Sequence, residues 1–183
     1  MLYFLHGSGD RGDNPFLIAK ASPFMMVREK GYLPFIVVAP LLGKRLDFGA
    51  FPDGYLAGSL EEFLADYRVD RSRIYLTGLS LGGEGCYRFA LLKPTTFAAI
   101  APLCAFMNSS PSMESIKTLP VWAIHGADDT VVLPKFGQKP VEALQKIGGN
   151  VRFSVLPGHD HDVWTDTYSD PAFYDWLLEH KRL

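Results

Sequence analysis

The segment Gly78–Gly82 reads Gly-Leu-Ser-Leu-Gly, and it places Ser80 between an apolar run, Ile74–Thr77, and a helical pattern, Gly85–Leu92. A serine on a sharp turn from a strand into a helix projects its hydroxyl above the sheet, and only small neighbours leave room for such a turn. The helix N-terminus behind it offers free amides to a developing oxyanion. The pattern predicts that Ser80 is a nucleophile for acyl transfer; the alternative is a glycine-rich turn without chemistry.

Two adjacent aspartates, Asp128 and Asp129, follow the apolar run Val121–Ile124 and compete for the role of the acid. After a nucleophile turn of this type, the acid comes next along the chain and the histidine comes last. The acid fixes the tautomer of the histidine and stabilises the imidazolium. The spacing His-Gly-x-x-Asp-x-x-Val, which begins at His125, favours Asp129, and Asp128 is kept as the alternative.

Two histidines, His159 and His161, lie in the loop after the last apolar run, Val151–Leu156, where the base is expected. Position alone does not choose between them. His6 and His125 each precede a glycine at a strand end, and we interpret both as residues that orient loops by hydrogen bonding.

The same His-x-His pair, His159 and His161, is also a pattern found in zinc sites. A zinc site needs further ligands from other loops and keeps one coordination position open for catalysis. A zinc site at these histidines would give the serine turn no role in the chemistry. We therefore expect activity without a metal or another cofactor.

Short apolar runs alternate with helical patterns along the chain, and this alternation predicts an α/β protein with a parallel sheet. The predicted strands are Leu2–Leu5, Phe35–Ala39, Ile74–Thr77, Phe97–Ala101, Val121–Ile124 and Val151–Leu156. A capping box at Ser59–Glu62 predicts the start of one helix. A further helix is predicted over Val141–Ile147, and Asp170 followed by Pro171 predicts the start of the last one.

Length and composition narrow the classes of function. A chain of 183 residues is predicted to form one domain, 1–183, and its net charge of −2 without a basic run argues against nucleic acid as a partner. No apolar stretch approaches the ~20 residues of a membrane span. Cys86 and Cys104 are expected to be buried free thiols. We expect a cytoplasmic protein, or a secreted one if a leader precedes this sequence; its oligomeric state is not predicted.

Four segments together resemble one family. They are Phe4–Gly12, Val69–Gly83, Leu119–Gly126 and His161–Trp164. The chain resembles bacterial α/β-hydrolase carboxylesterases of the predicted-peptidase or phospholipase–carboxylesterase-like family, near feruloyl esterases and polyhydroxybutyrate depolymerases. The resemblance covers nearly the whole chain.

The resemblance implies roles for several residues. It selects His161 over His159, because the family pattern of histidine, aspartate, any residue and tryptophan fits His161–Trp164. It also supports Asp129. It implies that the backbone amides of Ser8 and Leu81 form the oxyanion hole, which leaves His6 a structural role.

The implied fold is an α/β-hydrolase with a mostly parallel sheet of about six strands and helices on both faces. Family members usually begin with a β-hairpin, whereas this sequence begins on the strand before the oxyanion loop. The connection 104–119 is short and polar, with Asn108–Ser112 at its centre, so no large lid is expected. Phe106, Met107 and Trp164 are candidate walls of a small acyl pocket, or else core residues.

The implied function is a serine carboxylesterase that acts on small-molecule esters of short-chain or aromatic acyl groups through an acyl-enzyme on Ser80. A thioesterase or deacylase, or a serine peptidase, would use the same three residues. A non-catalytic binding protein of this fold is the least favoured alternative, because such proteins normally lack a member of the triad.

Overall fold

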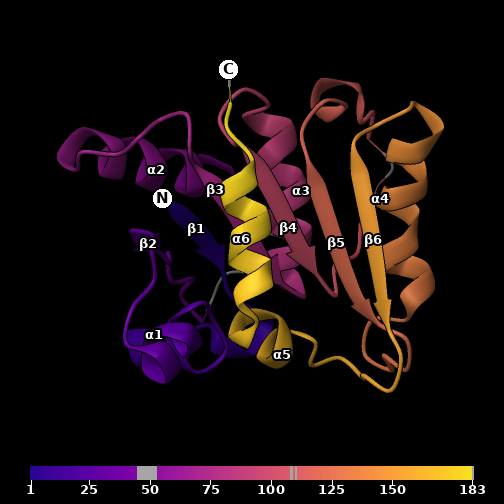
Figure 1. Ribbon diagram of the computed structural model, residues 1–183, viewed down its shortest axis with the longest axis horizontal. Coiled ribbons are helices and arrows are strands. Elements are labelled where there is room, and N and C mark those ends of the chain that lie inside the picture. Colours follow the sequence, from indigo (N-terminus) through magenta and orange to yellow (C-terminus); the bar gives the residue numbers. More distant parts are fainter. Residues whose placement is uncertain (45–52, 108, 110, 183) are drawn as a thin grey trace.

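Six strands form one parallel sheet in the computed structural model, which describes residues 1–44, 53–107, 109 and 111–182. The strands are β1 (Leu2–Leu5), β2 (Val37–Val38), β3 (Tyr75–Leu79), β4 (Ala99–Leu103), β5 (Val121–Gly126) and β6 (Val151–Leu156). Their order is β2-β1-β3-β4-β5-β6, and each neighbouring pair is parallel (Figure 1). The carboxyl ends of all strands therefore lie at one edge, where open α/β sheets bind their ligands.

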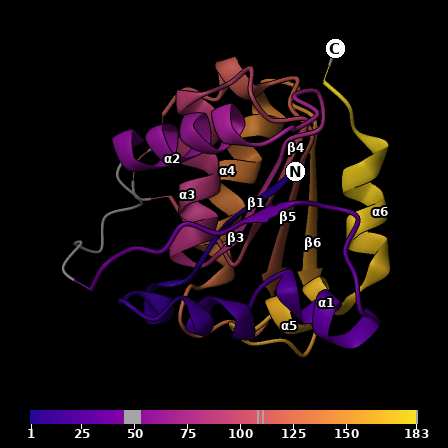
Figure 2. The same ribbon diagram turned by 90° about the vertical axis from the view of Figure 1, so that its left-hand side faces the viewer.

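Helices cover both faces of this sheet (Figure 2). One face carries α2 (Asp53–Asp66), α3 (Leu81–Leu92) and α4 (Pro134–Lys146), and the other carries α1 (Phe24–Lys30) and α6 (Pro171–Glu179). The short helix α5 (Trp164–Ser169) packs against α1 near the carboxyl edge. The predicted α/β-hydrolase architecture, with a parallel sheet of about six strands, is confirmed.

The strands of the sheet contribute to two hydrophobic cores, one on each face. In β1, Tyr3 and Leu5 belong to the core beneath α2 and α3, whereas Leu2 and Phe4 belong to the core beneath α6. This alternation is the two-residue period of a strand, and because both faces are covered the strand is apolar throughout. Burial on both faces explains why the sequence shows continuous apolar runs.

Several predicted boundaries shift in the structure. The predicted strand Phe35–Ala39 reduces to Val37–Val38, while Val151–Leu156 matches its prediction. The capping box at Ser59 is wrong, because α2 begins at Asp53 and Ser59 lies inside it. There the Ser59 hydroxyl donates to the Leu56 carbonyl at 3.3 Å, so it bonds back along its own helix.

The predicted helix Val141–Ile147 begins earlier, at Pro134, and runs through Pro140. Pro134 takes the first helical position, where a missing N–H costs nothing. Asp170 caps α6 as predicted, accepting a hydrogen bond from the Ala172 amide at 2.9 Å.

Two of the residues on which the prediction of a short polar connection rests, Asn108 and Ser110, lie outside the described residues. Within the described part of the chain, no helix has both the length and the apolar character needed to span a membrane.

Candidate active site

Ser80 occupies the turn between β3 and α3, with φ 54° and ψ −113°. A residue with a side chain rarely adopts a positive φ, and such backbone strain costs on the order of 1–3 kcal/mol. The turn is held at both ends, since the Ser80 amide donates to the Leu103 carbonyl at 2.9 Å and the Glu84 amide donates to the Ser80 carbonyl at 3.1 Å. The surrounding backbone thus fixes the strained conformation of Ser80.

The glycines around Ser80 are required by backbone contacts. A Cβ atom on Gly82 would overlap the Leu5 carbonyl oxygen, and one on Gly78 would lie 2.6 Å from the Gly82 oxygen. The first turn of α3 therefore packs directly against the end of β1. The two glycines of the Gly-x-Ser-x-Gly pattern are therefore needed for α3 to pack this closely against the sheet.

Cys104 lies directly after β4 and contacts the serine turn. It is fully buried, has φ 39°, and its amide donates to the Ile124 carbonyl at 2.8 Å. Burial raises the pKa of the Cys104 thiol, and a hydrogen bond from the Ser80 backbone opposes that effect. Cys86 and Cys104 are both free and buried, as the sequence predicts.

Asp129 is the buried member of the aspartate pair, with 1% of its surface exposed, whereas Asp128 is exposed. One carboxylate oxygen of Asp129 accepts hydrogen bonds from the amides of Val131 at 2.9 Å and Val132 at 2.8 Å. The other oxygen lies 2.8 Å from Nδ1 of His161. Of the two candidates, Asp129 is the one that the structure brings to a histidine of the predicted loop.

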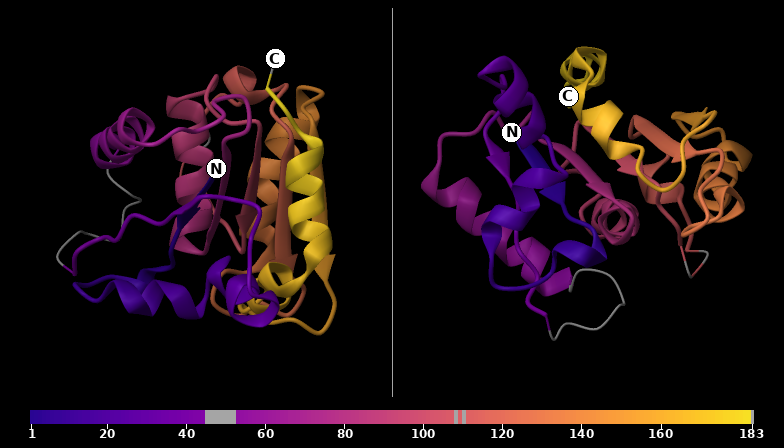
Figure 3. Two further views of the ribbon diagram at one scale, coloured as in Figure 1. Left: turned by 60° about the vertical axis from the view of Figure 1, so that its left-hand side comes forward. Right: turned by 90° about the horizontal axis from the view of Figure 1, so that it is seen from below.

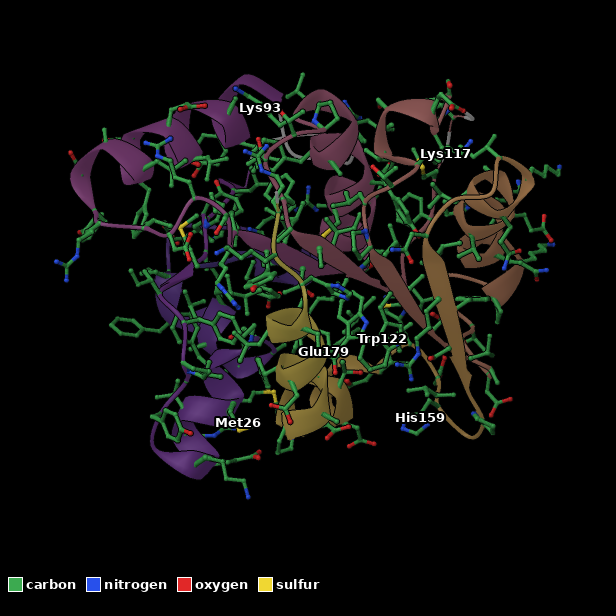
Figure 4. The ribbon with its side chains drawn as sticks, turned by 45° about the horizontal axis from the view of Figure 1, so that its top comes forward. Met26, Lys93, Lys117, Trp122, His159 and Glu179 are labelled. Atoms are coloured by element: carbon green, nitrogen blue, oxygen red, sulfur yellow. The ribbon has the colours of Figure 1, made fainter. Side chains whose placement is uncertain are left out.

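His161 turns Nδ1 toward Asp129, so Nε2 is the ring nitrogen that does not face this carboxylate. Its side chain is 16% exposed, and its ring meets the Trp164 ring edge-on at 5.4 Å. His159 instead places Nε2 2.9 Å from the Asp166 carboxylate, at the periphery of the molecule (Figure 4). The hydrogen bond to Asp166 raises the pKa of His159. The two loop histidines thus have different carboxylate partners.

Hydrogen bonds join the loop that carries Asp129 to the loop that carries His161. The Asp128 amide donates to the His159 carbonyl at 2.9 Å, and the Thr130 amide donates to the Asp160 carboxylate at 2.8 Å. This bond to Thr130 is the main reason that the pKa of Asp160 lies below its usual range. Gly126 has no room for a side chain, because a Cβ atom would overlap the Asp160 carbonyl oxygen. The two loops therefore act as one unit.

The three candidate residues follow three strands of the same sheet. Ser80 follows β3, Asp129 follows β5 and His161 follows β6, so all three lie at the carboxyl edge, which Figure 3 shows from below. The sequence placed Ser80 on a strand-to-helix turn, and Asp129 and His161 in loops that follow predicted strands. A serine at the same sheet edge as a histidine that a buried carboxylate orients suits nucleophilic attack.

His6 has a structural environment. It is fully buried, with Nδ1 2.7 Å from the Gly7 carbonyl and Nε2 accepting the Leu42 amide at 3.0 Å. Since Nε2 accepts, Nδ1 carries the hydrogen. Burial lowers the pKa of His6, which keeps the ring neutral. The ring fixes the start of the loop that carries Ser8.

The two predicted oxyanion donors lie at the starts of helical segments. Ser8 opens a short 3₁₀ segment, Ser8–Asp10, and Leu81 is the first residue of α3. The first amides of a helix have no acceptor within that helix. The Leu81 amide is thereby free of the α3 ladder, next to the predicted nucleophile.

A hollow of about 250 Å³ lies beside the Asp129 loop. Two of the predicted pocket residues, Phe106 and Met107, line it. Val131, Val132 and Phe136 complete its lining. Val132 is part of the predicted acid motif, but none of the three was predicted as a pocket residue, because nothing in their local pattern distinguishes them from core residues. Trp164, the third predicted wall, does not line this hollow and contacts the His161 ring instead.

In the part of the chain that the structure describes, no three His, Cys, Asp or Glu side chains come together as a metal site. The histidines of the His-x-His pattern are each engaged by an aspartate, His159 by Asp166 and His161 by Asp129.

Comparison with known proteins assigns the family. The model of the phospholipase/carboxylesterase family matches residues 57–171, which include the serine turn and both candidate loops. The chain belongs to this family. The expectation drawn from the resemblance is confirmed for the family and the fold.

Individual family relatives support the same assignment. The chain is 30% identical to carboxylesterase SOBER1 of Arabidopsis thaliana over 49% of its own length, and 29% identical to acyl-protein thioesterase 1 of Neurospora crassa over 62%. It spans 42% and 49% of the lengths of these two proteins. A solved thermostable esterase superimposes with a TM-score of 0.85 at 29% identity, covering 99% of this chain and 54% of that one.

Proposed function

We propose that the chain is a serine carboxylesterase that hydrolyses short-chain acyl esters through an acyl-enzyme on Ser80. The observation that carries the proposal is the buried Asp129 carboxylate, 2.8 Å from Nδ1 of His161, at the same sheet edge as a serine held at φ 54°. Membership in the phospholipase/carboxylesterase family supports the reaction class.

In the proposed mechanism, the Ser80 hydroxyl attacks the ester carbonyl while Nε2 of His161 takes its proton. Asp129 keeps the hydrogen on Nδ1 of His161 and stabilises the imidazolium. The amides of Ser8 and Leu81 donate to the tetrahedral oxyanion, and one such donor commonly contributes about 2.7–4 kcal/mol to lowering the barrier. His161 then returns the proton to the alcohol oxygen as the ester bond breaks.

Water completes the cycle on the acyl-enzyme. His161 removes a proton from the attacking water, a second tetrahedral intermediate forms, and its collapse releases the carboxylic acid while Ser80 regains its hydrogen. We assign the acyl group to the hollow lined by Phe106, Met107 and Phe136, because that hollow adjoins both the Asp129 loop and the segment after Cys104.

A thioesterase is the second candidate. It is favoured by the relative named acyl-protein thioesterase 1 and by exposed apolar residues at the hollow, where Val131 is 70% exposed. Thioester hydrolysis would use the same residues and differ in the pocket and the leaving group. An apolar surface beside the hollow could hold more of an acyl chain than the hollow itself.

The test is kcat/KM across p-nitrophenyl esters from acetate to palmitate, with matched acyl thioesters. We expect acetate and butyrate to react fastest and octanoate clearly more slowly, because a methylene that meets a wall misplaces the carbonyl. Ser80→Ala should remove all turnover with the fold intact. A Ser80→Ala variant as active as wild type would refute the proposal, and a maximum on long-chain thioesters would favour the second candidate.

A further inference from the structure

A second histidine contacts the Asp129 carboxylate from within the fold. His125, the fifth residue of β5, is 1% exposed. Its Nε2 atom lies 3.2 Å from the Asp129 oxygen that also faces His161, and 2.8 Å from the Val132 carbonyl oxygen. The mechanism proposed above does not use this ring, although it contacts the candidate acid.

The hydrogen on His125 can be placed from its partners. A carbonyl oxygen only accepts hydrogen bonds, so Nε2 of His125 must carry a hydrogen in order to bond Val132. Nε2 of His125 also lies 3.2 Å from an oxygen of Asp129, although its hydrogen bond goes to the Val132 carbonyl. His125 therefore places an N–H beside the carboxylate, whereas His161 forms the side-chain hydrogen bond to it.

Two imidazoles and two backbone amides surround the Asp129 carboxylate. One carboxylate oxygen receives the amides of Val131 and Val132, and the other faces Nδ1 of His161 and Nε2 of His125. A carboxylate buried without hydrogen bonds is costly, and each of its oxygens can accept two. His125 contributes a side-chain N–H beside Asp129 from outside the proposed reaction.

Helix α4 holds the His125 ring in place. A Cβ atom on Gly137 would overlap Nδ1 of His125, so the backbone of α4 lies directly against the ring. Figure 1 shows α4 packed beside β5 and β6, the strands that lead into both loops. The ring thus lies buried between a helix and the acid, and it is not among the residues that line the hollow assigned to the acyl group.

We propose that His125 is a positioning residue that keeps the second oxygen of Asp129 aimed at His161. This inference rests on the proposed function, since it gives His125 an effect on turnover through Asp129. It touches neither substrate nor the reacting atoms. Its role is to hold the buried carboxylate in one rotamer, through its contact with Asp129 and its hydrogen bond to Val132, whose amide donates to Asp129.

The first test compares two substitutions at His125 on p-nitrophenyl butyrate. His125→Leu removes the N–H beside the buried carboxylate, and we expect kcat to fall about tenfold with KM nearly unchanged, because Val132 loses a hydrogen bond and Asp129 a polar neighbour. His125→Gln can place an amide N–H near the position of Nε2 and should restore most of the loss. His159→Leu is the matched control, and it should keep nearly full kcat.

The second test is a double-mutant cycle with Asp129→Asn, using Ser80→Ala as the background rate. If His125 acts through the Asp129 carboxylate, adding His125→Leu to Asp129→Asn causes no further loss of kcat. The inference would be overturned if the double variant lost kcat by the product of the two separate factors. It would also be overturned if His125→Leu had the kcat of wild type.

If His125→Leu fails to fold, His125→Gln and His125→Asn provide the comparison, because the shorter asparagine cannot reach the same oxygen. Equal kcat in these two variants would overturn the inference. A wild-type protein without Ser80-dependent turnover would overturn the proposed function, and this inference with it.

Discussion

The turn at Ser80 and the paired loops that carry Asp129 and His161 are held by different forces. The turn is fixed by backbone contacts, since Gly82 meets the Leu5 carbonyl with no space for a Cβ atom. The loops are fixed by hydrogen bonds between side chains and backbone, such as that from Thr130 to Asp160 at 2.8 Å. The turn depends on the absence of side chains, whereas the loops, apart from the close backbone contact at Gly126, depend on the presence of polar side chains.

This difference determines how each region responds to substitution. A steric overlap in a closely packed region cannot be partly accommodated, so a side chain added in the turn must push α3 away from β1. A hydrogen-bonded pair of loops can lose one bond and keep the others, because each contributes only about 0.5–1.5 kcal/mol. We therefore expect substitutions in the turn to have abrupt effects on stability and activity, and substitutions in the loops to have graded ones. Asp129 and His161, which the proposed mechanism uses, are the exceptions.

The largest expected effect is at His161. His161→Ala should lower kcat by about 10⁴-fold or more, because attack by Ser80 and departure of the alcohol both lose their proton carrier. His159→Ala should stay within about threefold of wild type, since a surface pair such as His159 and Asp166 contributes little. Steady-state kinetics on p-nitrophenyl butyrate would measure both. The reverse order would assign the base to His159.

The aspartate pair gives the next largest effect. Asp129→Asn should lower kcat by about 10³–10⁴-fold, because an amide in that place can favour the wrong tautomer of His161. Asp128→Asn changes an exposed side chain and should leave kcat nearly unchanged. A larger loss in Asp128→Asn than in Asp129→Asn would assign the acid to Asp128.

Gly82→Ala examines the steric side of the comparison. The added methyl group overlaps the Leu5 carbonyl oxygen, and we expect a loss of unfolding free energy of about 3 kcal/mol or more, together with loss of activity. Gly58→Ala in α2 is the matched control, because the added Cβ atom meets nothing within 4 Å. This substitution should stabilise the helix slightly, since alanine loses less conformational freedom than glycine in a helix. Urea unfolding of both variants would measure the difference. Equal stabilities would mean that the turn adapts.

Asp160→Ala examines the hydrogen-bonded side. Losing the acceptor for the Thr130 amide and hydroxyl should lower kcat about three- to tenfold, a graded effect worth roughly one hydrogen bond. Asp160→Asn retains an oxygen for the Thr130 amide and should behave nearly as wild type. A loss as large as that of Asp129→Asn would show that the joined loops fail together.

The smallest expected effect is a pH dependence of the free energy of unfolding that arises from His6. Burial lowers the pKa of His6 below its usual 6.5, so as the pH falls through that value the unfolded chain takes up a proton before the folded chain does. Stability from the neutral ring is thus present above 6.5 and is lost progressively below it. Urea unfolding of wild type and His6→Gln across this pH range would measure it. If the unfolding free energies of wild type and His6→Gln differed by the same amount at every pH, His6 would not be a buried neutral ring with a lowered pKa.

The same comparison explains what could be predicted from the sequence. Ser80 and the parallel sheet could be predicted because their signals are local: a glycine pattern and continuous apolar runs. The choice between His159 and His161 could not be made from spacing, because it depends on which ring meets Asp129 across two loops. The start of α2 was also mispredicted, since Ser59 has the residue types of a capping box but bonds to Leu56 within the helix.

The roles of Val131, Val132 and His125 were hidden for a related reason. Val131 and Val132 act through their backbone amides, which carry no sequence signal. His125 was correctly expected to form hydrogen bonds, yet its contact with Asp129 depends on how the segment 126–132 folds back. Contacts made by backbone atoms, or across a returning loop, are invisible in a single sequence.

The burial of Cys104 against the Ser80 turn makes its thiol a probe of local opening. A buried thiol with a raised pKa does not react with alkylating reagents until the surrounding structure opens, so its labelling rate measures the free energy of that opening. Cys86, buried in α3, provides a second reading in the same molecule. Comparing the two rates before and after Ser80 is acylated would show how far a covalent intermediate stiffens the strands beneath it.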